Sequence, residues 1–322
     1  MVMRIRELDI DIPLSLAPMV GLSHSALRSL IAQLGGAGLF FTEMLSAKRL
    51  PSENEKKSPF LVRDGCERPL FFQIFTSTED EVDCAMARLD ELDAQGIDVN
   101  LGCPAPQLRK IGAGLELFKQ TQTVTSLIKR MRRQTILPLS VKIRLGETED
   151  SKKLLGTCQL FEDLGVDLIT IHARLNGEKF CRKPRWHMLG NVTPKLSVPV
   201  IANGGIFSVD DARRCLEQSG AAGLMIGRGA AHNPWLFRDI AKELFDVQPN
   251  SNLQDGAEVY SHFITLLEQR FTPERRLGRL KQFTHYFASN YSFGHLLVSR
   301  IQNSSSMKQA AERATDFFKH AA

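Results

Sequence analysis

The sequence predicts an α/β fold, a (β/α)8 (TIM) barrel followed by a small C-terminal helical domain. Eight short apolar runs recur through the first 230 residues, helical patterns lie between them, and only helical periodicity remains after about residue 250. Strand followed by helix, repeated eight times, is what a closed barrel of parallel strands requires. A doubly wound sheet with extra strands is the alternative, but eight units at this spacing favour closure.

The eight apolar runs have the composition of strands buried on both faces. They are too short for helices, rich in Val, Ile, Leu and Phe, and nearly continuous rather than alternating. The predicted strands are residues 14–17, 38–42, 70–75, 97–101, 139–143, 167–171, 198–202 and 223–226.

Helical spacing and boundary residues fill the intervals between these runs. Apolar residues recur at i, i+3, i+4 and i+7 over residues 82–89 and again over 124–131. Two pairs have capping-box spacing at expected helix starts: Ser77 with Asp80, and Ser208 with Asp211. Four glycines stand where helices are expected to end: Gly35, Gly96, Gly165 and Gly220.

The pattern changes near residue 250, where QPNSNLQDG has the composition of a linker. Beyond it, apolar residues such as Tyr260, Phe263 and Leu267 keep helical spacing. We therefore predict a barrel domain over residues 1–250 and a helical domain over residues 251–322.

Composition is that of an ordinary globular protein, with 43% hydrophobic and 24% charged residues. No apolar run approaches the roughly 18 residues of a membrane span, and the N-terminus lacks the apolar core of a signal peptide. The six cysteines show no CxxC or His–Cys clustering, which argues against a zinc site or a disulfide framework. We expect a cytoplasmic monomer with reduced thiols, no metal and no membrane association.

Positive charge is concentrated in the last fifth of the chain. The net charge is only +5, but residues 257–322 hold nine basic and five acidic residues. The run RFTPERRLGRLK carries five cations and the single anion Glu274. A solvated helix face is one interpretation; a polyanionic partner is the sharper one.

In a barrel of this kind the functional groups gather at the C-terminal ends of the strands. Strand seven ends in Asn203-Gly204-Gly205, and strand eight in Gly227-Arg228-Gly229. Glycines let backbone N–H groups approach an anion, and an arginine adds charge-assisted hydrogen bonds. Barrels commonly bind phosphate at these two loops, so the sequence predicts a phosphate site there.

Three further strand residues, Gln73, Lys142 and His172, are polar groups in buried positions that need a partner. A planar, phosphate-bearing cofactor that forms hydrogen bonds would supply one, and flavin mononucleotide (FMN) fits this description. No GxGxxG follows an early strand, so a tightly held dinucleotide is not indicated.

The sequence resembles the dihydrouridine synthase family, flavoenzymes that reduce selected uridines in tRNA. The resemblance rests on the ordered motifs APMVGLSH, TEML, LFFQIF, DVNLGCPAPQLRKIGAG, LSVKIRLG, ITIHAR, VPVIANGGI and MIGRGAAHNPWLF. They cover essentially the whole barrel, and the DxNxGCP segment followed by K-x-GAG is highly specific. The resemblance implies bound FMN, NADPH as its reductant and tRNA as the substrate.

The resemblance also implies which residues bind the cofactor: Pro18, Met19, Val20, Gln73, Lys142, His172, Asn203, Gly204, Gly205, Gly227 and Arg228. Lys142 would lie near flavin N1 and C2=O, where a fixed cation stabilises the negative charge of the reduced ring. Residues 203–205 and 227–228 would hold the phosphate end.

By the same resemblance, Cys103 is the expected general acid, and Asn100 would hold the uracil edge. A proton must reach one carbon of the uracil C5=C6 bond after hydride reaches the other, so the thiol must be protonated. Cys181, in a loop of no recognised motif, is the alternative thiol. The cysteines on helical patterns are expected to be buried and structural: Cys84, Cys158 and Cys215.

A uridine in folded RNA must be turned outward to reach a flavin, and phosphate contacts have to offset that cost. The basic tail would supply these phosphate contacts. The candidate RNA-contacting residues are Lys110, Arg144, Arg174, Arg275, Arg276, Arg279 and Lys281.

The chain departs from the family pattern at Ala173, Leu175 and Gly205, where Gly, Thr and an acidic residue are usual. These departures concern flavin contacts and substrate position more than the reaction. One alternative function is a dihydroorotate-dehydrogenase-like flavoprotein acting on a free pyrimidine. Another is an RNA-binding or folding module on a catalytically inactive barrel.

Overall fold

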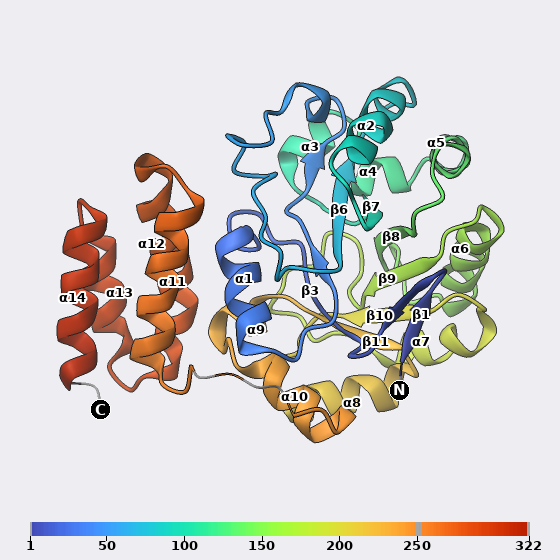
Figure 1. The fold of residues 1–322 in the computed structure, drawn as a ribbon. Coiled ribbons are helices and arrows are strands. Elements are labelled where there is room, and N and C mark those ends of the chain that lie inside the picture. The colour runs from blue at the N-terminus through green and yellow to red at the C-terminus, as the bar shows by residue number, and fades with distance from the viewer. Residues whose placement is uncertain (1, 249–250, 252, 321–322) are drawn as a thin grey trace.

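The structure, a computed structural model, describes residues 2–248, 251 and 253–320, and it confirms the predicted barrel (Figure 1). The barrel strands are β3 (Leu14–Leu16), β4 (Phe40–Phe41), β6 (Leu70–Phe75), β7 (Gly96–Asn100), β8 (Leu139–Arg144), β9 (Leu168–His172), β10 (Val200–Asn203) and β11 (Gly223–Ile226). Each overlaps a predicted run, and all pair in parallel. β11 pairs with β3, and a parallel bridge between Ser15 and Leu39 closes the ring toward β4, which excludes the doubly wound alternative.

Helices surround this ring and return the chain from one strand to the next. They are α1 (Ser25–Leu34), α2 (Asp80–Glu91), α3 (Pro106–Lys110), α4 (Leu115–Phe118), α5 (Thr121–Gln134), α6 (Ser151–Asp163), α7 (His187–Gly190), α8 (Val209–Ser219), α9 (Arg228–His232) and α10 (Leu236–Phe245). The apolar faces predicted over residues 82–89 and 124–131 are buried in α2 and α5.

The prediction of eight strand–helix units is wrong after the second strand. Residues 42–69, all of which the structure describes, contain the short strand β5 (Leu45–Ser46) and the 3-10 helix η1 (Leu50–Ser52), but no α-helix. A buried ion pair anchors this segment: Arg28 Nε on α1 lies 2.7 Å from the Glu67 carboxylate, which also accepts a hydrogen bond from Ser29 Oγ. In this segment a buried polar network attaches the chain to the barrel, whereas in the other units an amphipathic helix does so.

Helix boundaries follow the predicted residues in part. The Ser208 hydroxyl accepts a hydrogen bond from the Asp211 N–H (3.0 Å), as predicted, but Ser77 does not cap α2. Instead the Glu81 carboxylate, in the first turn of α2, accepts a hydrogen bond from the Ser77 N–H (3.2 Å). This bond fixes the chain just before the helix. Three of the four glycines follow helix ends with positive φ: Gly35, Gly165 and Gly220.

The fourth glycine, Gly96, begins β7 rather than ending a helix. A Cβ there would collide with the Phe71 ring inside the barrel, so its role is close packing. The general rule that glycine ends helices is overridden at this position by tertiary packing.

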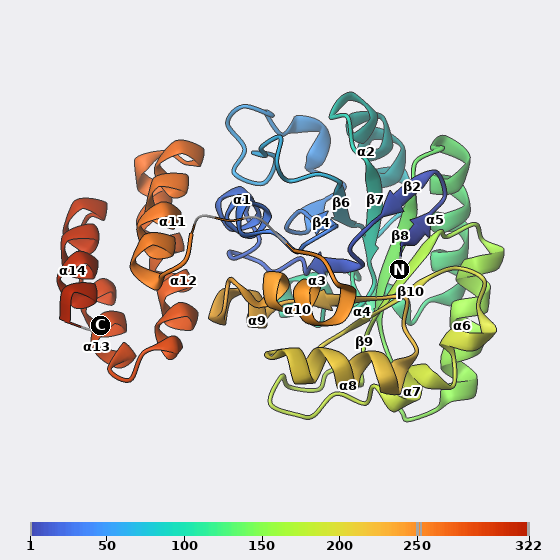
Figure 2. The same cartoon turned by 60° about the horizontal axis from the view of Figure 1, so that its bottom comes forward.

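A hairpin precedes the barrel and packs against its N-terminal end. It consists of β1 (Met3–Ile5) and β2 (Leu8–Ile10) and lies across the strands in Figures 1 and 2. Its Arg6 guanidinium lies 3.4 Å from Asp167, the residue before β9. The apolar hairpin side chains join Leu168 and Ile201 in a small core inside the barrel.

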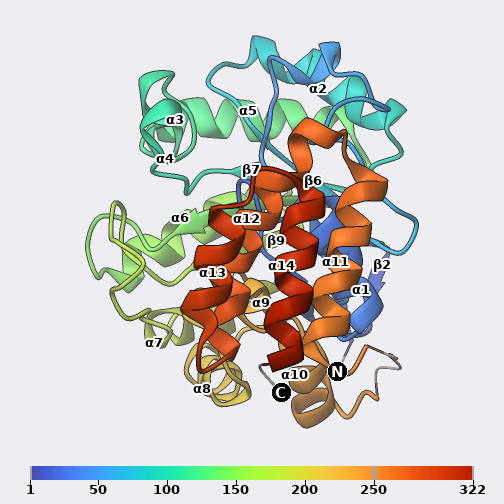
Figure 3. The ribbon, with the colours of Figure 1, turned by 90° about the vertical axis from the view of Figure 1, so that its left-hand side faces the viewer.

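Four helices form the tail: α11 (Gly256–Arg270), α12 (Arg276–Phe287), α13 (Gly294–Gln302) and α14 (Met307–His320). Short 3-10 turns accompany them and the barrel loops: η2 (Thr193–Lys195), η3 (Pro273–Arg275) and η4 (Ala288–Asn290). Figure 3 shows the four tail helices side by side over one flank of the barrel.

Aromatic side chains fill the tail, where Phe263 and Phe283 have ring centroids 4.0 Å apart. These side chains belong to the same apolar cluster as α1 and the other outer barrel helices. The predicted domain boundary at residues 250–251 touches residues outside the described part of the chain, and it stays a prediction. None of the helices that the structure describes has the length and apolar character needed to cross a membrane.

Candidate functional site

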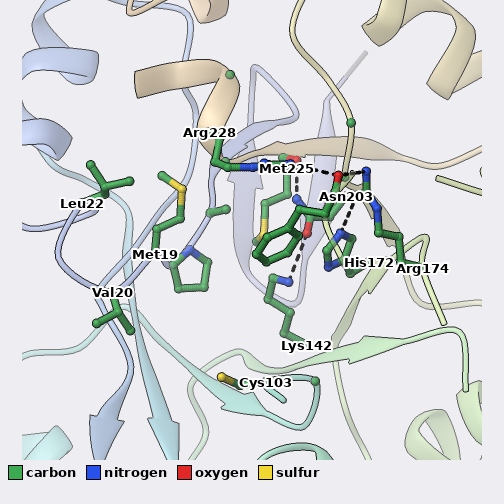
Figure 4. Close-up of a pocket in the computed structure, with 18 of the residues that line it drawn as sticks. Met19, Val20, Leu22, Cys103, Lys142, His172, Arg174, Asn203, Met225 and Arg228 are labelled. Atoms are coloured by element: carbon green, nitrogen blue, oxygen red, sulfur yellow. Dashed lines mark hydrogen bonds between the residues drawn. The ribbon is translucent and has the colours of Figure 1, made fainter. Parts of the chain in front are cut away.

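A cavity of about 330 Å³ opens at the C-terminal ends of the barrel strands (Figure 4). Every residue for which we predicted a cofactor-binding role lines it: Pro18, Met19, Val20, Gln73, Lys142, His172, Asn203, Gly204, Gly205, Gly227 and Arg228. The predicted general acid Cys103 lines it too, together with Asn100, Arg144 and Arg174. The fold thus gathers these residues at one place, while their individual roles stay predictions.

The turn that carries Cys103 is held from below by Asn100, the last residue of β7. The Asn100 Oδ1 atom accepts hydrogen bonds from the Cys103 N–H (3.0 Å) and the Gly102 N–H (3.3 Å). Its Nδ2 donates to Gln73 Oε1 (2.9 Å). Cys103 is only partly buried, and it lies across the cavity from Asn203 and Arg228 (Figure 4).

Lys142 rises from β8 into the cavity. Its Nζ donates to Asn203 Oδ1 (3.1 Å), and the Asn203 amide donates to the Met225 carbonyl (2.7 Å). Burial lowers the pKa of Lys142 to about 8, although the nearby Asp98 carboxylate opposes the shift. Among the described residues Asn203 is the hydrogen-bond partner of Nζ, so a protonated amine with three donors has some left for a ligand.

His172 lies at the end of β9 beside three arginines. Burial, followed by the charges of Lys142 and the arginines, lowers the pKa of His172 well below its usual value. The imidazole is therefore neutral at pH 7, and Arg174 Nη1 lies 2.9 Å from its Nε2, which fits donation to an unprotonated nitrogen. The Phe180 ring stacks over the imidazole with centroids 5.9 Å apart.

Arg144 and Arg174 are buried in the cavity wall, each 3% exposed, rather than presented on the outer surface. Arg144 donates to the carbonyls of Gly102 (3.0 Å) and Leu175 (3.0 Å). Arg174 donates to the carbonyls of Phe180 and Arg182. Both guanidinium groups thus hold the loop after β9 in place, and their predicted contact with RNA stays a prediction.

The glycines after β10 have a packing reason of their own. Gly204 has φ +111° and Gly205 φ +77°, a region that favours glycine. A Cβ on Gly204 would lie 2.6 Å from the His172 ring, and one on Gly205 would lie 2.7 Å from Pro184. Close approach alone therefore explains this pair, and its contact with phosphate stays a prediction.

Arg228 stands at the mouth between two exposed aromatic rings. Its guanidinium carbon lies 4.7 Å from the Phe180 centroid and 5.5 Å from the Phe207 centroid. Such stacking holds an arginine in position while leaving its edge free to donate hydrogen bonds.

The electrostatic character of the cavity is strongly positive. Its described lining includes Lys142, Arg144, Arg174 and Arg228 and contains no Asp or Glu. A concave site with this charge favours an anionic ligand such as a phosphate ester. In residues 2–248, 251 and 253–320 no group of three or more His, Cys, Asp and Glu is placed to hold a metal ion.

Sequence reasoning missed the contribution of the tail to this cavity. Gln282 and Tyr286, both on α12, line the mouth. The Gln282 amide donates to the Val20 carbonyl (3.3 Å), and the neighbouring Gly21 N–H donates to the Glu43 carboxylate. A helical pattern gives no indication of which exposed glutamine reaches a distant loop, so no sequence feature identifies Gln282.

The predicted basic cluster of the tail separates into two groups. Arg276 Nε donates to the Phe271 carbonyl (2.6 Å) at the end of α11, and the Arg279 guanidinium stacks over the Phe271 ring at 4.2 Å. These two arginines therefore have structural partners within the tail. Arg275 is exposed and Lys281 half-buried; neither lines the cavity, nor does Lys110, which is exposed on α3.

The other predicted cysteine roles and family departures can also be located. Cys181 is exposed and does not line the cavity. Cys158 and Cys215 are buried as predicted, but Cys84 is exposed on α2 because it lies beside the apolar stripe. Of the three departures, Ala173 and Leu175 face the outer core and only Gly205 lines the cavity.

Comparison with known proteins bears on this site. The family model "Dihydrouridine synthase (Dus)" matches residues 15–321. A probable tRNA-dihydrouridine synthase of Rhodobacter capsulatus is 32% identical over 269 residues, covering 82% of this chain and 81% of that relative. The probable tRNA-dihydrouridine synthase 1 of Synechocystis sp. is 31% identical over 225 residues, covering 70% of this chain but 63% of the relative's length.

Among solved structures, a 2-naphthoyl-CoA reductase in complex with 2-naphthoyl-CoA superposes with a TM-score of 0.54. The sequence identity is 11%, and the match covers 77% of this chain and 52% of that one. At this identity the likeness concerns the fold alone.

Proposed function

This chain belongs to the dihydrouridine synthase family, and we propose that it reduces the C5=C6 bond of specific uridines in tRNA to 5,6-dihydrouridine. We propose bound FMN as the cofactor and NADPH as its reductant. The observation that carries the proposal is the meeting of Cys103, in the loop after β7, and Lys142, on β8, in one positively charged cavity.

The residues of the cavity fit FMN. Lys142 has hydrogen-bond donors left beyond Asn203, and its positive charge suits the ring region that becomes negative on reduction. Arg228, fixed between Phe180 and Phe207, is a natural partner for the phosphate. When bound, reduced FMN supplies the hydride to one carbon of the uracil C5=C6 bond.

Cys103 would then deliver the proton to the other carbon. The thiol stands on a turn fixed by Asn100, so its position does not depend on the mobile end of a long side chain. Lys142 and Arg144 line the same cavity as this thiol, so the proposed proton donor stands in a positively charged site.

The tail supports a polymeric substrate over a free pyrimidine. Gln282 and Tyr286 place α12 at the mouth, so a substrate that enters the cavity passes along this helix. Exposed Arg275 and half-buried Lys281 lie on or just before the same helix, where they could pair with phosphates.

The test is to incubate the purified protein, FMN and NADPH with an unmodified tRNA transcript and measure dihydrouridine by mass spectrometry of the digested RNA. We expect product that depends on NADPH, and none from free uridine or orotate. Product from the free pyrimidine alone would favour the dihydroorotate-dehydrogenase-like alternative. A protein that binds RNA but stays colourless with added FMN would favour an inactive barrel.

A further inference from the structure

Beneath the cavity lies a carboxylate that the proposed reaction does not use directly. Asp98, in the middle of β7, is fully buried and does not line the cavity. Its Oδ2 accepts a hydrogen bond from Gln73 Nε2 (2.6 Å), and its Oδ1 accepts one from Ser140 Oγ (2.6 Å). The strand register explains this meeting, because Gln73, Asp98 and Ser140 are aligned partners on β6, β7 and β8.

The chemistry of a carboxylate gives this contact a direction. An ionised carboxylate only accepts hydrogen bonds, so Gln73 must present its NH2 group to Asp98 and its carbonyl to Asn100. Asn100 must in turn present its NH2 group to Gln73 and its carbonyl to the Cys103 N–H. Two amide side chains that could each be turned by 180° are thereby fixed in series.

We propose that Asp98 is a positioning residue that sets, through Gln73 and Asn100, the orientation of the turn carrying Cys103. Its catalytic consequence rests on the proposed function, whereas the effect on the turn does not. Without the carboxylate, Gln73 is free to reverse its amide. The Asn100 amide then turns as well, and its oxygen no longer accepts the hydrogen bond from the Cys103 N–H.

The electrostatics of the surrounding strands agree with this assignment. Burial raises the pKa of Asp98 to about 6, against the hydrogen bonds from Gln73 and Ser140 and the charge of Lys142. The carboxylate in turn opposes the lowering of the Lys142 pKa, while Arg144 on the same strand adds to it. Asp98 is thus an acceptor above about pH 6 and helps to keep Lys142 charged.

Two substitutions separate orientation from charge. In Asp98→Asn the amide oxygen can still accept from Gln73 while its NH2 donates to the Ser140 hydroxyl, so the orientation is kept and the charge is lost. Asp98→Leu removes the acceptor and the charge together. Ser140→Ala is the matched control, because it removes one hydrogen bond to Asp98 and leaves the bond to Gln73 intact.

The first measurement is hydrogen–deuterium exchange of the peptide containing Gly102 and Cys103, on the holoenzyme as purified. We expect Asp98→Leu to speed exchange of that peptide roughly 10-fold, the scale on which loss of one hydrogen bond shifts an opening equilibrium, and Asp98→Asn and Ser140→Ala to match the wild type. Unchanged exchange in Asp98→Leu, or equal acceleration in Asp98→Asn, would overturn the proposal. This readout decides the matter even if the wild type makes no dihydrouridine.

The second measurement is the pH profile of uridine reduction. Because burial lowers the pKa of Lys142 to about 8, we expect the wild-type rate to fall as pH rises through about 8. Asp98→Asn should move this alkaline limb to lower pH, because Lys142 loses the support of the carboxylate; an unmoved limb would contradict that support. If Asp98→Leu fails to fold, exchange of the Gly102–Cys103 peptide that is faster in Asp98→Asn than in the wild type still refutes the assignment.

Discussion

The two ends of the barrel are built from opposite kinds of residue. At the N-terminal end the hairpin β1–β2 contributes Met3, Ile5 and Ile10 to an apolar core that continues into the barrel. At the C-terminal end the barrel strands present Lys142, His172 and other polar side chains to a cavity. The comparison teaches that one end supplies stability while the other bears the positive-φ glycines and buried charges of a site.

The largest expected effect falls on the polar end. We expect Cys103→Ala to slow uridine reduction at least about 100-fold, since a positioned general acid contributes on this scale, while NADPH still reduces the flavin. Single-turnover kinetics with pre-reduced enzyme measure the step. Cys181→Ala, at an exposed thiol outside the cavity, is the control and should keep the wild-type rate. Full turnover by Cys103→Ala would remove the assigned proton donor.

The apolar end should respond in stability instead. Ile5 is fully buried in the hairpin core, and Ile5→Ala should lower the free energy of unfolding by about 2–5 kcal/mol. Urea denaturation measures the loss, and the rate per folded molecule should stay the same. A large drop in that rate would show that the two ends are coupled.

Lys142 should show an intermediate effect that depends on pH. Because its pKa is lowered to about 8, the ammonium is charged at pH 7 and loses its charge as pH rises through 8. We expect flavin reduction by NADPH to weaken over that range in the wild type. Lys142→Arg, which stays charged, should remove the alkaline limb, and Lys142→Met should be slow, roughly 10-fold or more, at every pH. A limb that survives in Lys142→Arg would assign it to another group.

The smallest expected effect concerns the tail cations beside the polar end. Arg275→Ala with Lys281→Ala should weaken tRNA binding and reduce the slope of log affinity against log salt by roughly one to two. Filter binding across a salt series measures both quantities. Lys152→Ala with Lys153→Ala, exposed on α6, is the control of equal charge and should change neither by as much.

Local patterns predict the eight barrel strands, and motifs that resemble those of the dihydrouridine synthase family predict many of the residues that line the cavity. Apolar runs mark the strands, and polar residues such as Gln73 and Lys142 interrupt them where the chain meets the site. The segment between β4 and β6 escaped prediction because its structure depends on Glu67 meeting Arg28, a contact between distant residues with no periodicity.

Charge clusters in the sequence proved less informative than interrupted strands. Arg276 and Arg279 belong to a basic run, yet their donors and ring contacts serve the Phe271 corner of the tail. Arg144 and Arg174 hold loop carbonyls inside the protein. A run of cations in the sequence indicates a basic segment, but it does not indicate which guanidinium groups already form hydrogen bonds within the protein.

The contact between Gln282 and the Val20 carbonyl has a consequence for experiment. Helix α12 contacts the turn at Val20, which we propose also contacts the flavin, so a movement of the helix should move that turn. A flavin held there would serve as a built-in optical probe of RNA docking, its absorbance and fluorescence shifting when tRNA settles on α12. The protein would then need no attached dye to report, in real time, the arrival of its substrate.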